Sequence, residues 1–105
     1  MIRNVVLGKI NDPGDPAAQA QLDAGLAGIA ALDLPGQLAM HIGRDAGLRE
    51  GGWTFAITND WVDADAYRGY DLDEEHNRYR AMIVEVLCDV ARVQFEIDLS
   101  PASPQ

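Results

Sequence analysis

The stretch LAMHIGRDAGLREGGWTFAIT, residues 38–58, decides the fold because two strand-like segments follow each other with no helical pattern between them. Larger apolar side chains alternate with small or polar ones in residues 38–43, and they alternate again in residues 53–58. A period of two is typical of a strand with one buried face. Residues 45–52 contain three glycines and indicate a loop. The stretch therefore predicts two consecutive strands.

A strand and a helix are predicted on the N-terminal side. Residues 2–10 are β-branched and apolar on both faces, as expected for a strand that is covered on two sides. Asp15 then provides an N-cap and Pro16 a first helical residue. One apolar stripe follows at helical spacing: Leu22, Leu26, Ile29 and Leu32. A helix over about 16–32 is expected, which Pro35 and Gly36 would end.

Two helices and a strand are predicted on the C-terminal side. Residues 63–67 indicate a short helix, and a longer helix is expected to open at about His76. Its apolar face would carry Tyr79, Met82, Ile83, Val86, Leu87 and Val90. Residues 92–97 alternate polar and apolar side chains, which predicts a final strand with one wet side. We expect one domain over residues 1–99 and a disordered tail over 100–105, which holds two prolines and two serines.

The order β-α-β-β-α-β matches the ferredoxin-like α+β fold, a four-stranded antiparallel sheet with its helices on one face. Such a two-layer arrangement leaves the other sheet face uncovered. That face would also be apolar, since Val5 and Leu7 point away from Val6 in the first strand. A large exposed apolar face is rare in a monomer. We therefore expect a homodimer in which the two sheets pack face to face.

Charge and composition exclude several classes of protein. The net charge of −9, from 17 acidic and 8 basic residues, disfavours binding to nucleic acid or to an anionic membrane. The N-terminus lacks the pattern of a signal peptide, so a cytoplasmic protein is expected. Seven arginines against one lysine indicate a GC-rich bacterial genome. The one cysteine, Cys88, is expected to be a small buried residue in the last helix.

Residues 67–79, YRGYDLDEEHNRY, hold all three tyrosines and one of the two histidines, and they are the chemically richest segment. His76 is a candidate catalytic base, because an imidazole titrates near neutral pH. Tyr67 and Tyr70 are candidate partners that would orient a carbonyl or donate a proton to an enolate. In the alternative interpretation, His76 caps a helix or pairs with an acid at the surface, and each tyrosine only packs.

Two further polar residues are candidate ligand-binding groups. If Asn4 and His41 project from their strands into one cavity, they would form a polar floor beneath His76. The alternative places His41 at the dimer interface or in solvent. No metal and no cofactor are expected, because residues 71–75 lack the glycine and the spaced glutamate of a calcium loop and the chain has no cysteine pair for zinc.

The sequence resembles the stress-responsive dimeric α/β-barrel (Dabb) domain family from its start to about residue 98. The resemblance is carried by IRNVVLGK at 2–9, GR at 43–44, GWTFA at 52–56, DW at 60–61 with Tyr67 six residues later, and RVQFE at 92–96. It implies a ferredoxin-like protomer that dimerises into a barrel, with a cavity between sheet and helices. The family includes plant stress-stable proteins and a polyketide cyclase with a tyrosine and a histidine near its pocket.

The resemblance places His76 near the histidine at the opening of the last helix. Tyr67 matches the tyrosine that follows the aromatic-acidic segment, whereas Tyr70 alone keeps a gap of five residues to His76. Asn4 stands where many members carry a histidine. We therefore expect a protein that binds a small carbonyl or phenolic molecule, as a cofactor-free cyclase, isomerase or lyase. The alternative is a non-enzymatic stress-response dimer or an accessory subunit of a biosynthetic enzyme.

Overall fold

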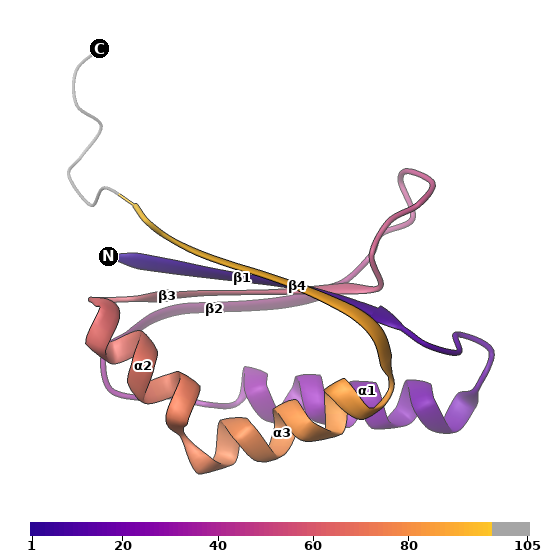
Figure 1. Cartoon of the computed structure of the whole chain (residues 1–105), viewed down its shortest axis with the longest axis horizontal. Coiled ribbons are helices and arrows are strands. Elements are labelled where there is room, and N and C mark those ends of the chain that lie inside the picture. The colour runs from indigo at the N-terminus through magenta and orange to yellow at the C-terminus, as the bar shows by residue number, and fades with distance from the viewer. Residues whose placement is uncertain (98–105) are drawn as a thin grey trace.

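The computed structural model describes residues 1–97 as four strands and three helices (Figure 1). The strands are β1 (Ile2–Ile10), β2 (Gln37–Arg44), β3 (Phe55–Trp61) and β4 (Leu87–Glu96). The helices are α1 (Pro16–Ala30), α2 (Ala64–Leu72) and α3 (Glu74–Glu85). The expected tail at 100–105 and the last two residues of the expected domain, 98–99, lie outside the described residues.

The four strands form one antiparallel sheet in the order β2-β3-β1-β4. All three helices lie against one face of this sheet, and the other face is open (Figure 1). The predicted ferredoxin-like α+β fold is confirmed. The two consecutive strands of residues 38–58 are the neighbours β2 and β3, with His41 opposite Thr58 and Ile42 opposite Ile57.

The last helix is shorter than the sequence pattern predicts. Helix α3 ends at Glu85, where the N–H of Val86 bonds back to Ile83, and the chain enters β4 at once. Leu87 and Val90 are strand residues paired with β1, so their expected place on the helix is wrong. Cys88 also lies in β4 and is exposed, which corrects the expectation of a buried helical cysteine. Apolar residues at 86, 87 and 90 satisfy helical spacing, but pairing with β1 satisfies their backbone groups instead.

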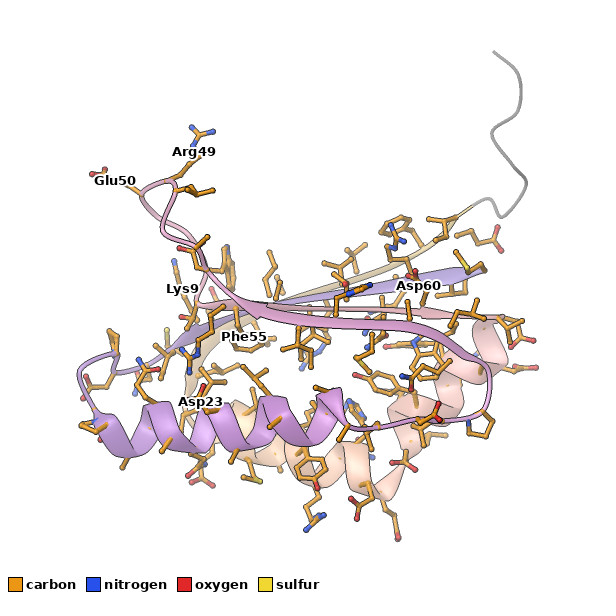
Figure 2. The ribbon with its side chains drawn as sticks, turned by 180° about the vertical axis from the view of Figure 1, so that it is seen from behind. Lys9, Asp23, Arg49, Glu50, Phe55 and Asp60 are labelled. Carbon is orange, nitrogen blue, oxygen red and sulfur yellow. The ribbon has the colours of Figure 1, made fainter. Side chains whose placement is uncertain are left out.

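Other boundaries also move. Strand β3 begins at Phe55 and runs on to Trp61, whereas Trp53 lies in the connection, with the ammonium of Lys9 5.3 Å from the centre of its ring. Helix α2 extends to Leu72, beyond the short helix predicted at 63–67. The connection between β2 and β3 projects from the sheet on the side away from the helices, with Arg49 and Glu50 at its tip (Figure 2).

The core lies between the helices and the sheet. Its buried members are Ile10, Leu22, Leu26, Ile29, Phe55, Ile57, Trp61, Tyr70 and Ile83. In strand β4 the apolar side, rather than the polar side, faces away from the helices. Gln94 faces the helix side, where it donates a hydrogen bond to the buried Asn4, while Val93 and Phe95 lie on the open face and are 53% and 43% exposed. The open face is therefore partly apolar, as the first strand predicts.

Candidate functional site

A cavity lies between the sheet and the helices, and it contains the catalytic candidates. Its lining residues are Val6, Ile29, Phe55, Ile57, Tyr67, Tyr70, Asp71, His76, Arg80, Ile83, Val84, Leu87, Val90 and Arg92. Most of these side chains are apolar, and the polar ones come from α2, α3 and β4. The free volume is about 40 Å³, which at roughly 10–15 Å³ per water is room for about three or four water molecules.

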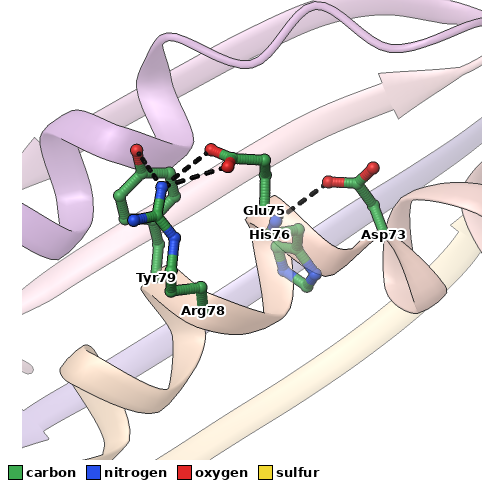
Figure 3. Close-up of polar contacts among 5 residues, drawn as sticks. All are labelled: Asp73, Glu75, His76, Arg78 and Tyr79. Carbon is green, nitrogen blue, oxygen red and sulfur yellow. Dashed lines mark hydrogen bonds and ion pairs between the residues drawn. The ribbon is translucent and has the colours of Figure 1, made fainter.

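His76 is placed by the start of α3. Asp73 is the N-cap of this helix, and its carboxylate accepts a hydrogen bond from the backbone N–H of His76 at 2.9 Å (Figure 3). An N-cap of this kind fixes the first turn, since it satisfies a backbone donor that the helix leaves free. The imidazole is 5% exposed. The capping hydrogen bond uses the backbone N–H of His76, so the imidazole ring is free to contact a molecule in the cavity.

The surroundings of His76 keep its ring neutral at neutral pH. Burial lowers the pKa of His76 below its ordinary value, and the positive charge of Arg80 adds to this effect. Asp71, the Asn77 side chain and Asp73 oppose it with smaller contributions. Nδ1 of His76 is buried and makes no well-formed hydrogen bond within residues 1–97, although the Asn77 side chain lies close enough to raise the pKa of the ring. A neutral imidazole with a free nitrogen is able to accept a proton.

Tyr70 packs directly on His76 and is the inner tyrosine of the site. The two ring centres lie 3.9 Å apart, and Trp61 stacks on the other side of Tyr70 at 4.8 Å. The indole N–H of Trp61 donates to Asn59 at 2.6 Å, which holds this stack against β3. Burial raises the pKa of Tyr70 to about 12, although the Asn59 side chain lowers it in part. Its hydroxyl therefore stays protonated at neutral pH.

Tyr67 is the outer tyrosine and lies nearer the charged side chains of the cavity. Its ring centre is 6.1 Å from that of Tyr70, and its side chain is half-buried. Burial is the main cause that raises the pKa of Tyr67, and Asp71 contributes, while Arg92 and Arg80 lower it. Tyr67 thus offers a protonated hydroxyl inside the cavity wall. Both candidate tyrosines line the same cavity as His76.

The two candidate ligand-binding residues do not share this cavity. Asn4 is 2% exposed on the helix side of β1, where Gln94 occupies its side-chain oxygen at 2.9 Å, and it is not among the lining residues. His41 is exposed on the open face of β2, near enough to lower the pKa of Asp60 slightly. The expectation that both residues project into one cavity is wrong. Strand β3 separates their strands, and they point to opposite faces of the sheet.

Two arginines of the cavity, Arg80 and Arg92, were not among the sequence candidates. Arg80 lies on α3 one turn after His76, and Arg92 lies on β4. The spacing of four residues between His76 and Arg80 was a usable signal, because such residues share one helix face. Arg92 was missed because the polar side of the last strand was expected to face water alone, whereas the exposed Arg92 also lines the cavity.

Two general features are also established for the described residues. Within residues 1–97, no group of three or more histidine, cysteine, aspartate or glutamate side chains is arranged to hold a metal ion. None of the helices in this part of the chain has the length and apolar character needed to cross a membrane.

Comparison with solved structures identifies the family. A dimeric ferredoxin-like protein of unknown function from Thermobifida fusca is 31% identical, with 91% of this chain and 90% of that chain covered and a TM-score of 0.78. The chain belongs to this dimeric ferredoxin-like family. Neither a protein-family model nor a curated protein matches the sequence.

Less similar solved structures show how widely the ferredoxin-like fold is shared. A Dabb family protein from Mesorhizobium loti is 15% identical, with 91% of this chain and 95% of that chain covered and a TM-score of 0.70. A hydroxynitrile lyase from Passiflora edulis is 13% identical, with 94% of each chain covered and a TM-score of 0.72. The predicted resemblance to the Dabb domain is confirmed. The description of several neighbours as dimeric supports a homodimer.

Proposed function

We propose that this protein binds a small carbonyl or phenolic molecule in the cavity and acts on it without a cofactor, by acid-base catalysis. One observation carries the proposal: His76 is buried and lacks a partner for Nδ1, and its ring lies against the protonated Tyr70 in a largely apolar cavity. Burying a polar atom without a hydrogen bond is costly. A buried imidazole nitrogen that no side chain occupies is available to accept a proton or a hydrogen bond from a bound molecule.

The proposed chemistry assigns one role to each of the three side chains. His76 takes a proton from the carbon next to the carbonyl, so that a C–H bond breaks and an N–H bond forms. The electron pair moves to the carbonyl oxygen, where the hydroxyl of Tyr67 donates a hydrogen bond to the developing enolate. Tyr70 holds the imidazole ring in place by stacking. The enolate then reacts as in a cyclase, an isomerase or a lyase.

A lyase reaction has support from the fold, since the hydroxynitrile lyase from Passiflora edulis shares it. The sequence resemblance to the Dabb family favours a cyclase. In cyanohydrin cleavage the base takes the proton of the hydroxyl, the C–C bond to the nitrile breaks and its electron pair leaves with cyanide, whereas a cyclase forms an enolate. Both reactions need a base beside a carbonyl-derived oxygen. Stereochemistry and product are set by the apolar lining, which differs between proteins of one fold.

The test is a ligand screen by thermal shift, followed by turnover assays on each hit. The panel holds β-keto compounds, phenols and cyanohydrins. We expect His76→Gln to abolish turnover and Tyr67→Phe to reduce it by roughly 10²-fold or more, since positioned acid-base groups contribute about 10²–10⁴-fold. The matched controls are His41→Gln on the open face and Tyr79→Phe, whose ring packs against Gly28 of α1 and does not line the cavity. Equal turnover in His76→Gln and His41→Gln would refute the proposed role of His76.

The size of the cavity favours a second candidate, a non-enzymatic stress-response dimer. Pockets for organic ligands have volumes of roughly 300–1,000 Å³, whereas this cavity has about 40 Å³. In the enzyme, side chains at the edge such as the exposed Val84 would move when the ligand enters. The non-enzymatic candidate predicts that no compound in the panel stabilises the protein.

We also propose that the dimer forms through the open sheet faces. The exposed apolar side chains Val93 and Phe95 lie on this face, beside Val5. Burial of such a face is the usual reason for a stable interface between two sheets.

A further inference from the structure

The edge of the cavity carries a positive charge in a strongly acidic chain. Its charged lining residues are Arg80, Arg92 and Asp71, two arginines against one aspartate. The whole chain has a net charge of −9. His76, which is neutral, adds no charge to this group. The cavity is therefore a local exception to the acidity of the protein.

The two arginines differ in how their charge is balanced. Arg80 forms an ion pair with Asp71 at 3.0 Å, with the side chains 38% and 45% exposed. Arg92 makes no ion pair within residues 1–97, whereas the arginines at 3, 44, 68 and 78 each have a carboxylate partner in that part of the chain. A cavity lining with an unbalanced guanidinium is suited to an anion.

The position of Arg92 in the sheet directs this charge toward the site. Arg92 pairs with Val6 of β1 on the helix side of the sheet, and both residues line the cavity. Arg92 and Arg80 both lower the pKa of Tyr67, so their guanidinium groups lie within electrostatic reach of its hydroxyl. The positive charge thus adjoins the outer tyrosine. The apolar side chains of Ile29 and Ile57 form the interior.

We propose that the cavity selects a small carboxylate-bearing ligand, whose carboxylate binds the guanidinium of Arg92 while its carbonyl or phenol lies against Tyr67 and His76. Arg80 is the second cation, and its pairing with Asp71 holds it beside the site. This inference rests on the proposed function and names its ligand class. A guanidinium binds a carboxylate with two parallel hydrogen bonds, so the contact also fixes the orientation of the ligand.

The test compares acids with their own methyl esters. The esters have nearly the same shape as the acids but lack the negative charge. The probes are levulinate, a keto acid, and 4-hydroxyphenylacetate, a phenolic acid. Dissociation constants for each acid and ester are measured by NMR titration on the wild-type protein, Arg92→Gln, Arg92→Lys and the control Arg49→Gln. Arg49 lies at the tip of the β2–β3 connection, away from the cavity (Figure 2). Its substitution by glutamine makes the same change in net charge as Arg92→Gln but leaves the cavity unchanged.

We expect the wild-type protein and Arg49→Gln to bind at least one acid about tenfold more tightly than its ester, a typical gain for a charge-assisted hydrogen bond. Arg92→Gln should lose this preference without loss of ester affinity, and Arg92→Lys should keep part of it. Equal binding of acid and ester by the wild-type protein, or a preference that survives in Arg92→Gln, would overturn the inference and leave the proposed function standing. If the wild-type protein binds neither form of either probe, both proposals are wrong.

Discussion

His76 differs from the other histidine of the chain in every physical respect that bears on acid-base chemistry. It is buried against an aromatic ring and its pKa is lowered, whereas His41 lies exposed on a strand. The contrast comes from position alone, because both are single imidazoles in a chain without a metal-binding pattern. Both histidines are candidates by residue type, and only the fold shows that their surroundings differ.

The lowered pKa of His76 makes stability sensitive to acid. Because the unfolded chain binds a proton at this site more readily than the folded chain, the free energy of unfolding falls as the pH drops below the ordinary value of 6.5 and continues to fall toward the lower pKa of the folded state. We expect urea denaturation to show a smaller loss of stability between pH 7.5 and 5.5 in His76→Gln than in the wild-type protein.

His41→Gln is the control for this acid sensitivity. It should lose stability with falling pH as the wild-type protein does. If His76→Gln and His41→Gln respond to pH in the same way, His76 is not the buried titrating group. An NMR titration of the two imidazoles gives an independent reading, in which His76 should titrate below 6.5.

Tyr70 provides a second test at the opposite end of the pH scale. Burial raises its pKa to about 12, so it should ionise later than an ordinary tyrosine. In a spectrophotometric titration of tyrosinate, the step at about pH 12 should be missing from Tyr70→Phe. Retention of that step in Tyr70→Phe would show that another tyrosine is the most buried one.

The cluster of His76, Tyr67 and Tyr70 could be predicted from the sequence because the three residues lie within ten positions, in α2 and the first turn of α3. The places of Asn4 and His41 could not. Alternation assigns residues to two faces of a strand but does not say which face the helices cover. Arg92 was missed for the same reason, since polar side chains of β4 face the helix layer.

At the scale of elements, the helix layer depends on close contact between α1 and α3. A Cβ added at Gly25 of α1 would lie 2.5 Å from Cγ1 of Ile83 and 3.2 Å from the backbone oxygen of Tyr79. Ile83 is a core residue that also lines the cavity, so it has little freedom to move. The glycine lets the two helices approach each other, which places α3 and His76 at the sheet.

Alanine substitutions of glycine test this packing. We expect Gly25→Ala to destabilise the protein by about 1–3 kcal/mol, because overpacking outweighs the better helix propensity of alanine. Gly69 of α2 is the matched control, since nothing lies within 4 Å of an added Cβ there. Gly69→Ala should stabilise by up to about 1 kcal/mol. Urea denaturation measures both, and a stabilising Gly25→Ala would contradict the close approach.

The helix α1 and the strand β1 were predicted with nearly correct bounds because each has a clear stop, a proline or glycine cluster. The passage from α3 to β4 has none. Residues 86–90 contain neither proline nor glycine, and the helix ends there because β1 offers backbone partners from Ile2 to Ile10. Long-range pairing of this kind is invisible to local sequence patterns.

At the scale of the whole molecule, the open sheet face carries apolar side chains that a monomer would leave exposed to water. We expect sedimentation equilibrium to give twice the chain mass of 11.4 kDa. Val93→Lys, on the open face, should shift the protein toward the monomer because it places a charge in the proposed interface. Leu72→Lys, on an exposed residue at the end of α2, should leave the dimer intact. A monomeric wild-type protein, or a dimeric Val93→Lys, would contradict the sheet-to-sheet interface.

The order of elements was sufficient to predict the ferredoxin-like fold, since few topologies fit the pattern β-α-β-β-α-β. It was also sufficient to predict the open face, and the apolar side chains of Val5 and Leu7 on that face then predicted a dimer. The cavity depends on side chains from β1, β3, β4, α1, α2 and α3. Local patterns could show which residues share one helix or strand, but not which of these elements meet at the cavity.

The central claim is that His76 acts as a base inside the cavity, and hydrogen–deuterium exchange tests it most directly. The exchange of the hydrogens next to the carbonyl of phenylacetone is followed by NMR in D₂O with the wild-type protein, His76→Gln and His41→Gln. We expect the wild-type protein and His41→Gln to accelerate the exchange and His76→Gln to leave it at the rate of buffer alone. Equal rates with all three proteins would contradict the claim.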